Sequence, residues 1–199
     1  MNKLLAILSG LIVFGTTIPY LLDILKGKVV PLRSTRLMFM LLIVLAFLQQ
    51  RSLGVGLAMI ITIAELAGSV MLFVTSMKKG TGGFNRLDVA CYMLLGASLG
   101  AWYTTGDPYI ALVFTILADF VAFFPVIYRT AKDPKSETQL FYWGGVVGPL
   151  LVMAVDTDRS AKNIIFVAYL AIVNGFVALL INRQYFKKGL PKTNKVAVY

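Results

Sequence analysis

The stretch PYIALVFTILADFVAFFPVIY, residues 108–128, contains a single charged side chain, Asp119. A helix that crosses the hydrocarbon core of a bilayer needs about 20 mostly apolar residues, so this stretch predicts one membrane span. Six further runs of similar character lie at residues 4–25, 34–50, 53–77, 87–103, 138–155 and 163–181. The sequence therefore predicts an all-α integral membrane protein with seven transmembrane helices.

The composition of the whole chain supports this class. Hydrophobic residues make up 58% of the 199 residues, charged residues make up 14%, and the mean hydropathy is +0.81. A typical soluble domain is only about 45–50% apolar even when glycine is counted, and a disordered chain is more polar still. A signal peptide is an alternative for the first run, but that run continues to Leu25 without a small-residue cleavage site.

Several kinds of chemistry are excluded by the residues that the chain lacks. It contains no histidine and a single cysteine, Cys91. Histidine-dependent triads, histidine metal sites and internal disulfides all need residues that are missing. The acidic residues near the ends of the spans show no spacing typical of an acid–base pair. We therefore expect no enzymatic activity, no cofactor and no bound metal.

The basic residues indicate the orientation of the spans. The net charge is +10, and 15 of the 19 lysines and arginines fall in connectors on one side of the expected membrane. The other side has Lys3, Arg51, Arg159 and Lys162. The positive-inside rule then places the N-terminus outside and the C-terminus in the cytoplasm. This placement favours membrane lipid over nucleic acid as a partner, and the short connectors favour a prokaryotic inner membrane.

An internal repeat is visible at the inner ends of the first and fifth spans. The segments are IPYLLDILKGKVVPLRST, residues 18–35, and FPVIYRTAKDPKSET, residues 124–138. Each contains a proline, a short apolar stretch, a basic loop with a second proline, and a Ser or Thr that opens the next helix. Pro19 aligns with Pro125 in this repeat, and Thr35 aligns with Thr138.

The third and seventh spans also match. Glu65 lies 13 residues before Lys78, and Asn174 lies 13 residues before Lys187. Repeats of this kind decide the fold, and an odd linker helix lets two helix triplets run parallel. We expect two parallel three-helix bundles, a linker helix between them and a basic tail. The corresponding ranges are 1–80 and 107–189 for the bundles, 81–106 for the linker and 190–199 for the tail.

This plan of three, one and three helices, with its N-terminus outside, resembles the SWEET and PQ-loop transporter superfamily. The resemblance covers almost the whole chain as topology, and it rests on Pro19, Pro125 and the loops that follow them. Tyr20 and Val126 stand where the PQ dipeptide would have its glutamine, so the chain resembles a divergent member. The plan is also similar to that of nicotinamide riboside transporters and KDEL receptors.

Three polar side chains are predicted to lie in the middle of their spans: Glu65, Asp119 and Asn174. Such groups are costly in a bilayer and usually mark a cavity or a transport pathway. We predict that they bind the substrate. The alternative is that they only form hydrogen bonds between helices. The resemblance strengthens the prediction that Asn174 binds the substrate, because substrate-binding asparagines recur in the third helix of SWEET triplets. Trp143 is a fourth candidate for the site, with an aromatic belt at the membrane interface as its alternative.

Proton coupling and hinges follow from the same residues. A carboxyl group in a low dielectric favours its neutral form, so Glu65 and Asp119 are predicted to gain and lose a proton during transport. Pro19, Pro125 and Pro149 remove backbone hydrogen bonds inside helices, which predicts three hinges. Static kinks are the alternative for these prolines.

The expected function is a transporter or facilitator of a small polar solute that works by alternating access. The main alternative is a receptor of the same fold, which binds its ligand without moving it. A polar route that reaches both faces would favour transport, and a pocket closed permanently on one side would favour a receptor. A small-molecule substrate is the expected partner. The sequence leaves open whether the chain forms a homo-oligomer.

Overall fold

The computed structural model describes residues 2–82 and 86–189, without the side chains of residues 87 and 184–189. The helices in these ranges are α1 (Asn2–Leu25), α2 (Arg33–Ser52), α3 (Met59–Lys79), α4 (Arg86–Thr105), α5 (Pro108–Lys132), α6 (Gln139–Val155) and α7 (Ala161–Gly189), with the short 3₁₀ helix η1 (Pro134–Ser136). Within the described ranges the only β-type pairing is an isolated bridge between Leu32 and Thr81. The prediction of an all-α chain is confirmed, and the predicted tail, residues 190–199, lies outside the described residues.

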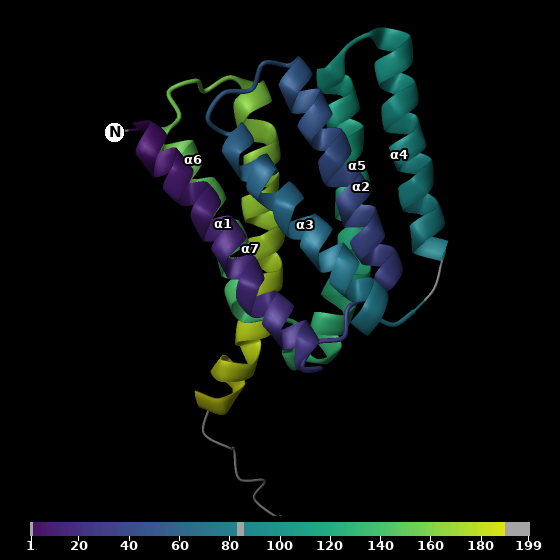
Figure 1. Cartoon of the computed structure of the whole chain (residues 1–199), viewed down its shortest axis with the longest axis vertical. Coiled ribbons are helices and arrows are strands. Elements are labelled where there is room, and N and C mark those ends of the chain that lie inside the picture. Colours follow the sequence, from purple (N-terminus) through teal and green to yellow (C-terminus); the bar gives the residue numbers. More distant parts are fainter. Residues whose placement is uncertain (1, 83–85, 190–199) are drawn as a thin grey trace, which may run out of the picture.

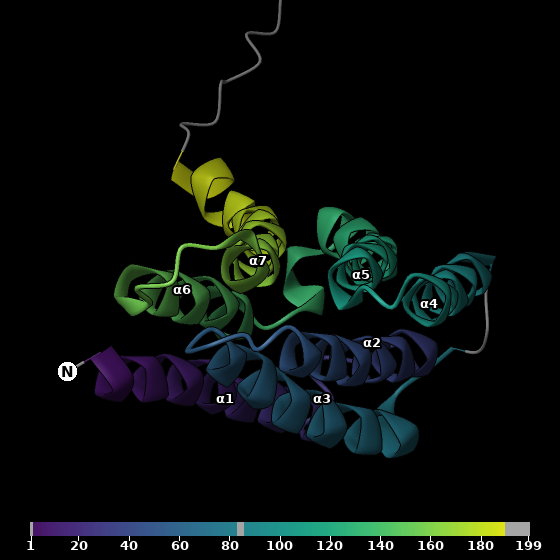
Figure 2. The same cartoon turned by 90° about the horizontal axis from the view of Figure 1, so that it is seen from above.

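The helices stand side by side in two layers. Seen from above, α1, α2 and α3 lie in one layer, and α5, α6 and α7 lie in the other (Figure 2). Helix α3 packs against both α1 and α2, and α7 packs against both α5 and α6. The layers meet where α1 contacts α6 and where α2 contacts α5. The start of α1 and the end of α7 lie at opposite ends of the bundle (Figure 1).

Helix α4 lies at the edge of the bundle. It packs mainly on α5 and touches α2 (Figures 1 and 2). The buried Ser98 hydroxyl on α4 is within 2.8 Å of the Thr115 hydroxyl on α5. Gln49 on α2 donates to Ser98 at 2.9 Å. This hydrogen-bonded group fixes α4 to the outside of the two layers.

Local sequence determines where two of the helices begin. Asp107 caps α5, because its carboxylate accepts a hydrogen bond from the Tyr109 N–H at 2.8 Å, and Pro108 occupies the first helical position. The third span was predicted from residue 53, but α3 begins at Met59. Gly54 has a φ of +64°, a conformation that suits glycine and ends α2. Residues 53–58 therefore form a connection rather than part of the helix.

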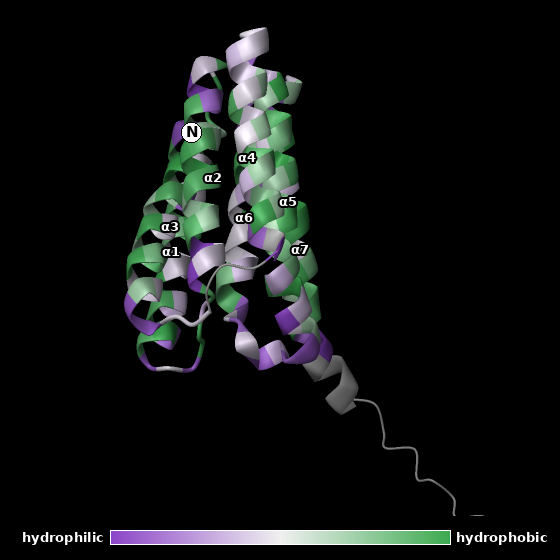
Figure 3. Ribbon diagram, turned by 90° about the vertical axis from the view of Figure 1, so that its right-hand side faces the viewer, coloured by the Kyte–Doolittle hydropathy of each residue, from purple (hydrophilic) through white to green (hydrophobic). Residues whose placement is uncertain are grey.

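Four helices are long and apolar enough to cross a membrane: α1, α3, α5 and the described part of α7 up to Arg183. Helix α6 is apolar but has 17 residues. Helix α2 is less apolar because it contains Arg36, Gln49 and Gln50, yet all three side chains are buried. Apolar residues run along most of the helices (Figure 3), and many of them, such as Leu4, Leu11 and Ile172, are exposed on the outside of the bundle. Exposed apolar surface of this extent is typical of contact with lipid.

The layers make their closest contact through glycines of α6. A Cβ atom at Gly144 or Gly148 would collide with Thr16 or Val13 of α1. At Gly145 it would lie 2.6 Å from the Cγ of Asn174 on α7. These glycines therefore allow α6 to pack directly against both α1 and α7.

Candidate functional site

A cavity lies between the two layers and is lined by residues of α1, α2, α3, α5, α6 and α7. Glu65, Asp119 and Asn174 all line it, so three of the four predicted substrate-binding residues come together. The volume in which the centre of a water molecule can lie is about 50 Å³. Since one water needs about 10–15 Å³ on this scale, the cavity has room for a few waters.

Glu65 lies nearer the start of its helix than the sequence predicted. Because α3 begins at Met59, Glu65 is in the second turn and not at the centre. Gly68 and Ser69, one turn further along, line the same cavity. No hydrogen bond or ion pair joins Glu65 to any other residue that the structure describes. Its carboxyl group is therefore available to a molecule in the cavity.

Asp119 lies near the middle of α5 and is buried. The hydroxyl of Tyr169, on α7, donates a hydrogen bond to its Oδ2 at 2.5 Å. The two carboxyl groups thus differ: Asp119 has a donor from a neighbouring helix, and Glu65 has none within the described ranges. Both belong to the same cavity although they come from different layers.

Asn174 is buried on α7, and its side-chain N–H donates to the backbone carbonyl of Leu170 at 2.9 Å. The side-chain carbonyl oxygen accepts no hydrogen bond from the described residues. Gly145 of α6 leaves the space that this side chain occupies. Asn174 therefore presents an unused acceptor at the cavity wall.

Aromatic rings form much of the remaining wall. The lining rings are those of Phe39, Phe123, Phe141, Tyr142 and Phe166. Trp143, the fourth predicted site residue, does not line the cavity and packs on the apolar cluster that contains Val173 and Val177. The reason is helical geometry, since successive side chains of a helix point about 100° apart. The neighbours of Trp143, Phe141 and Tyr142, face the cavity in its place.

One end of the cavity, called here the Arg36 end, is closed by a buried charged group. Arg36 lies in the first turn of α2 and Glu137 precedes α6, and their closest side-chain nitrogen and oxygen are 3.8 Å apart. The hydroxyls of Tyr20 and Tyr142 donate to the same Glu137 oxygen at 2.6 and 2.9 Å. Arg36 also donates to the hydroxyl of Tyr20.

The Arg36 end has a further contact between the layers. Thr138 donates to the Asp23 carboxylate of α1 at 2.8 Å. The guanidinium of Arg36 lies over the ring of Tyr20, 4.7 Å from its centroid. Helices α1 and α2 are thereby fixed to the start of α6 by charge-assisted and neutral hydrogen bonds.

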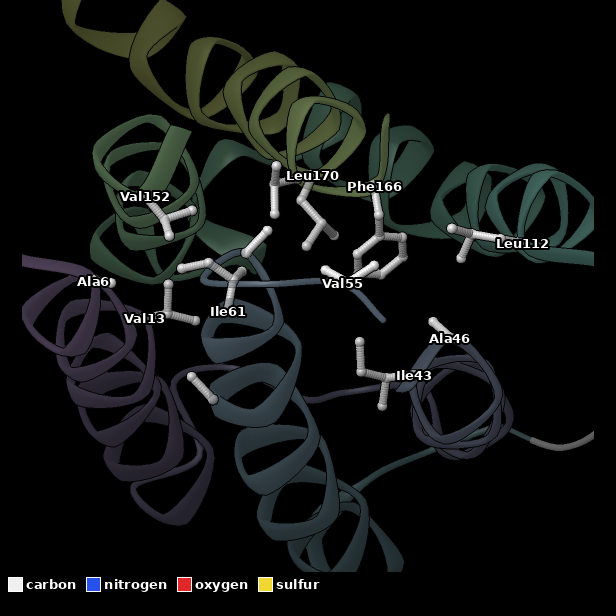
Figure 4. Packing of buried hydrophobic residues seen from close by; sticks show 13 residues of the cluster. Ala6, Val13, Ile43, Ala46, Val55, Ile61, Leu112, Val152, Phe166 and Leu170 are labelled. Carbon is white, nitrogen blue, oxygen red and sulfur yellow. The ribbon is translucent and has the colours of Figure 1, made fainter. Parts of the chain in front are cut away.

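The opposite end, called here the Asp156 end, is closed mainly by apolar packing. Figure 4 shows the cluster that fills it, with Ile61 of α3, Val152 of α6 and Phe166 of α7 among its members. The connections above this cluster also touch. Asp156 accepts a hydrogen bond from the Ala58 N–H at 3.3 Å, and Asn163 accepts one from the Gly56 N–H at 3.0 Å.

The predicted hinge prolines all lie inside helices, Pro19 in α1, Pro125 in α5 and Pro149 in α6. Pro19 directly precedes Tyr20 of the charged group at the Arg36 end. Pro149 is buried next to Gly148, where α6 meets α1. Two of the three prolines therefore lie at contacts between the layers, which would have to break for the layers to separate.

Sequence reasoning did not identify the pair of Arg36 and Glu137. It treated Arg36 as one of the basic residues that indicate orientation and Glu137 as a residue near a surface. A signal was present, because Arg36 falls inside the predicted second span, where a charge usually has a buried partner. The partner itself is more than 100 residues away in the chain, so the sequence could not name it.

Comparisons with known proteins add nothing to this geometry. No family model, no curated protein and no solved structure matches the chain. The case for a function therefore rests on the cavity, on its two closed ends and on the internal repeat.

Proposed function

We propose that this protein is a membrane transporter or facilitator that moves a small polar solute by alternating access. The observation that carries the proposal is that equivalent positions of the internal repeat line one cavity. The offset that aligns Pro19 with Pro125 also aligns Thr17 with Phe123, and both of the latter line the cavity. Glu65 and Asn174, which are equivalent in the third and seventh spans, line it as well.

The packing of the helices supports two parallel bundles joined by α4. The third helix of each set of three packs between the other two, as α3 does between α1 and α2. The repeat also relates the two contacts between layers, because exchanging equivalent helices converts the α1–α6 contact into the α5–α2 contact. In this proposal all seven helices cross the membrane, and the basic connectors place the Arg36 end in the cytoplasm.

In the proposed cycle the present arrangement is the occluded state. Contacts between the layers lie at both ends of the cavity, and the cavity is smaller than the 300–1,000 Å³ typical of pockets for small organic ligands. Each end opens in turn when the bundles rock against one another, with bending at Pro19, Pro125 and Pro149. Binding sites at the interface of two repeats are common in transporters of this kind.

Glu65 and Asp119 serve proton coupling in this proposal. They are the two acidic side chains of the cavity lining, and the other ionisable groups near them in the described ranges include Arg36, Tyr142, Tyr169 and Cys91. A carboxyl group away from water is more stable without its charge. One or both carboxyl groups would therefore be protonated while the empty binding site turns from one side of the membrane to the other.

The proposal is tested with the purified chain and a panel of sugars, amino acids, nucleosides and vitamins. A ligand that binds only the folded protein raises its melting temperature. Each ligand found in this way is then offered to proteoliposomes that contain the protein. We expect uptake that depends on pH and is lost in Glu65→Gln, Asp119→Asn and Asn174→Ala.

Asp133→Asn is the matched control, because this exposed aspartate lies between α5 and η1, away from the cavity lining. It should leave uptake unchanged. A ligand that stabilises the protein and depends on the three cavity residues, yet never enters the proteoliposomes, would contradict transport and support a receptor. Full pH-dependent uptake by both carboxyl variants would contradict proton coupling.

A further inference from the structure

The charge balance of the cavity points to the class of the solute. Its lining contains two carboxyl groups, Glu65 and Asp119, and one basic group, Arg36. The charge of Arg36 is already compensated, since Glu137 lies 3.8 Å away and is buried with it. Within the described residues, no other basic side chain lines the cavity. Whenever both carboxyl groups are ionised, they therefore leave a negative charge that no basic side chain of the cavity lining compensates.

Buried negative charge needs a partner. Charged groups away from water are costly unless a counter-charge and hydrogen bonds compensate them. The Tyr169 hydroxyl supplies one hydrogen bond to Asp119, and Glu65 receives none from the described residues. A cation held between the two carboxylates would supply the missing charge.

A second and independent observation is the acceptor on Asn174. This residue is 5% exposed, and its side-chain oxygen accepts no hydrogen bond from the described residues. This oxygen is not fully enclosed by the protein, so it can accept a hydrogen bond from a molecule in the cavity. A protonated amine offers only N–H donors, so it matches an acceptor oxygen as well as two carboxylates. A quaternary ammonium group has no N–H and would rely on the carboxylates and the aromatic rings alone.

The aromatic wall suits an organic cation better than a metal ion. Rings attract a cation that lies over their faces, within about 6 Å of the centroid. The protein already uses its wall in this way, because the guanidinium of Arg36 lies 5.8 Å from the centroid of Phe39, a lining residue. Phe123, Phe141 and Phe166 offer further rings.

We propose that the solute is a small organic cation with an ammonium or quaternary ammonium group, which binds between Glu65 and Asp119 against the aromatic wall. This inference rests on the proposed function and narrows its substrate class. The cation binds when an end opens and the cavity widens, because the occluded volume is that of a few water molecules.

The test compares cations with uncharged molecules of the same shape. The full chain in detergent is titrated at mildly alkaline pH with choline and with its neutral isostere 3,3-dimethylbutan-1-ol. Phenethylammonium with 2-phenylethanol and propylammonium with propan-1-ol form two more pairs, and ionic strength is held constant with sodium chloride. Binding is read from the shift in melting temperature and from calorimetry.

We expect at least one cation to bind about tenfold or more tightly than its neutral partner, which corresponds to about 1.4 kcal/mol. Glu65→Gln should remove that preference, and Asp119→Asn should reduce it. Asp133→Asn should keep it. The comparison within the wild-type protein remains decisive even where a cavity variant fails to fold.

The remaining outcomes separate this inference from the proposed function. If no cation of the panel binds better than its neutral isostere, the inference is overturned and transport of a neutral solute still stands. If the preference persists in Glu65→Gln and in Asp119→Asn, the inference is overturned because the cation binds elsewhere. If the preferred cation binds at the carboxylates but is not carried into proteoliposomes, the inference holds and transport is contradicted.

Discussion

The two ends of the cavity are closed by different kinds of interaction. At the Arg36 end, a buried arginine and a buried glutamate are held together by the hydroxyls of Tyr20 and Tyr142. At the Asp156 end, an apolar cluster around Ile61 packs between the layers, and the hydrogen bonds above it join residues 53–58 to Asp156 and to the start of α7. At the Arg36 end, each buried polar group needs its partner for its charge or hydrogen bond to be satisfied. The apolar cluster is instead held by many small, independent contacts.

This difference bears on how each end can open. Breaking a buried ion pair leaves a charge without a partner, so the Arg36 end is either fully formed or strongly destabilised. Apolar side chains can separate step by step, because each contact between two atoms contributes only a small fraction of a kcal/mol, although the side chains are then exposed to water. The Arg36 end therefore behaves as a switch with two states, and the Asp156 end as a packed plug.

The largest effect is expected from removing one partner of the ion pair. Glu137→Ala leaves Arg36 buried without its counter-charge and takes the acceptor from both tyrosines, so we expect a loss of about 3–5 kcal/mol in the free energy of unfolding. Unfolding in detergent, followed by circular dichroism, measures this loss. The double variant Arg36→Met with Glu137→Leu should recover most of it. A single variant as stable as the wild type would show that the Arg36 end is not held by charge.

A smaller effect is expected at the plug. Ile61 is completely buried in the apolar cluster, and Ile61→Ala should cost about 2–4 kcal/mol through the cavity that it creates. Ile63, on the same helix, is 50% exposed on the outer surface. Ile63→Ala is therefore the matched control and should change stability by less than about 0.5 kcal/mol. Equal losses from the two isoleucines in the same unfolding assay would mean that packing does not close the Asp156 end.

The smallest effect is expected from the connections above the plug. Asp156→Ala removes hydrogen bonds from the N–H groups of Ala58 and Asp158, which should cost about 0.5–1.5 kcal/mol. The exposed Asp133 provides the control variant, Asp133→Asn, because asparagine can still accept the hydrogen bond from the Lys135 N–H. If Asp156→Ala proved as damaging as Glu137→Ala, the two ends would be closed by the same kind of interaction, and the contrast drawn here would be wrong.

Much of the helical structure could be predicted because apolar runs and their interruptions are local features. The error at the start of α3 is also local: Leu53, Val55 and Leu57 are apolar enough to extend the run, and only the conformation of Gly54 shows that the helix has ended. Hydropathy also understates α2, whose Arg36 and Gln49 are polar but buried by other helices.

The candidate site was predictable only in part. Glu65, Asp119 and Asn174 could be found because a polar side chain in an apolar span is rare, and the structure places all three on one cavity. The sequence could not show that Trp143 faces away, because that depends on the rotation of α6 against α7. Nor could it show the partner of Arg36, since that pairing depends on how the two layers meet.

The central claim is that one cavity opens to both sides of the membrane. Ser69 lines the cavity, and Cys91 is the single natural cysteine, so Ser69→Cys in a Cys91→Ala background gives one reactive site. Val70→Cys, which faces outward, serves as the control. A maleimide that cannot cross membranes is applied to oriented proteoliposomes from either side. The account predicts that residue 69 is labelled from both sides, and faster from the cytoplasmic side in Glu137→Gln. Labelling from one side only, whatever the ligand or pH, would contradict transport and favour a receptor.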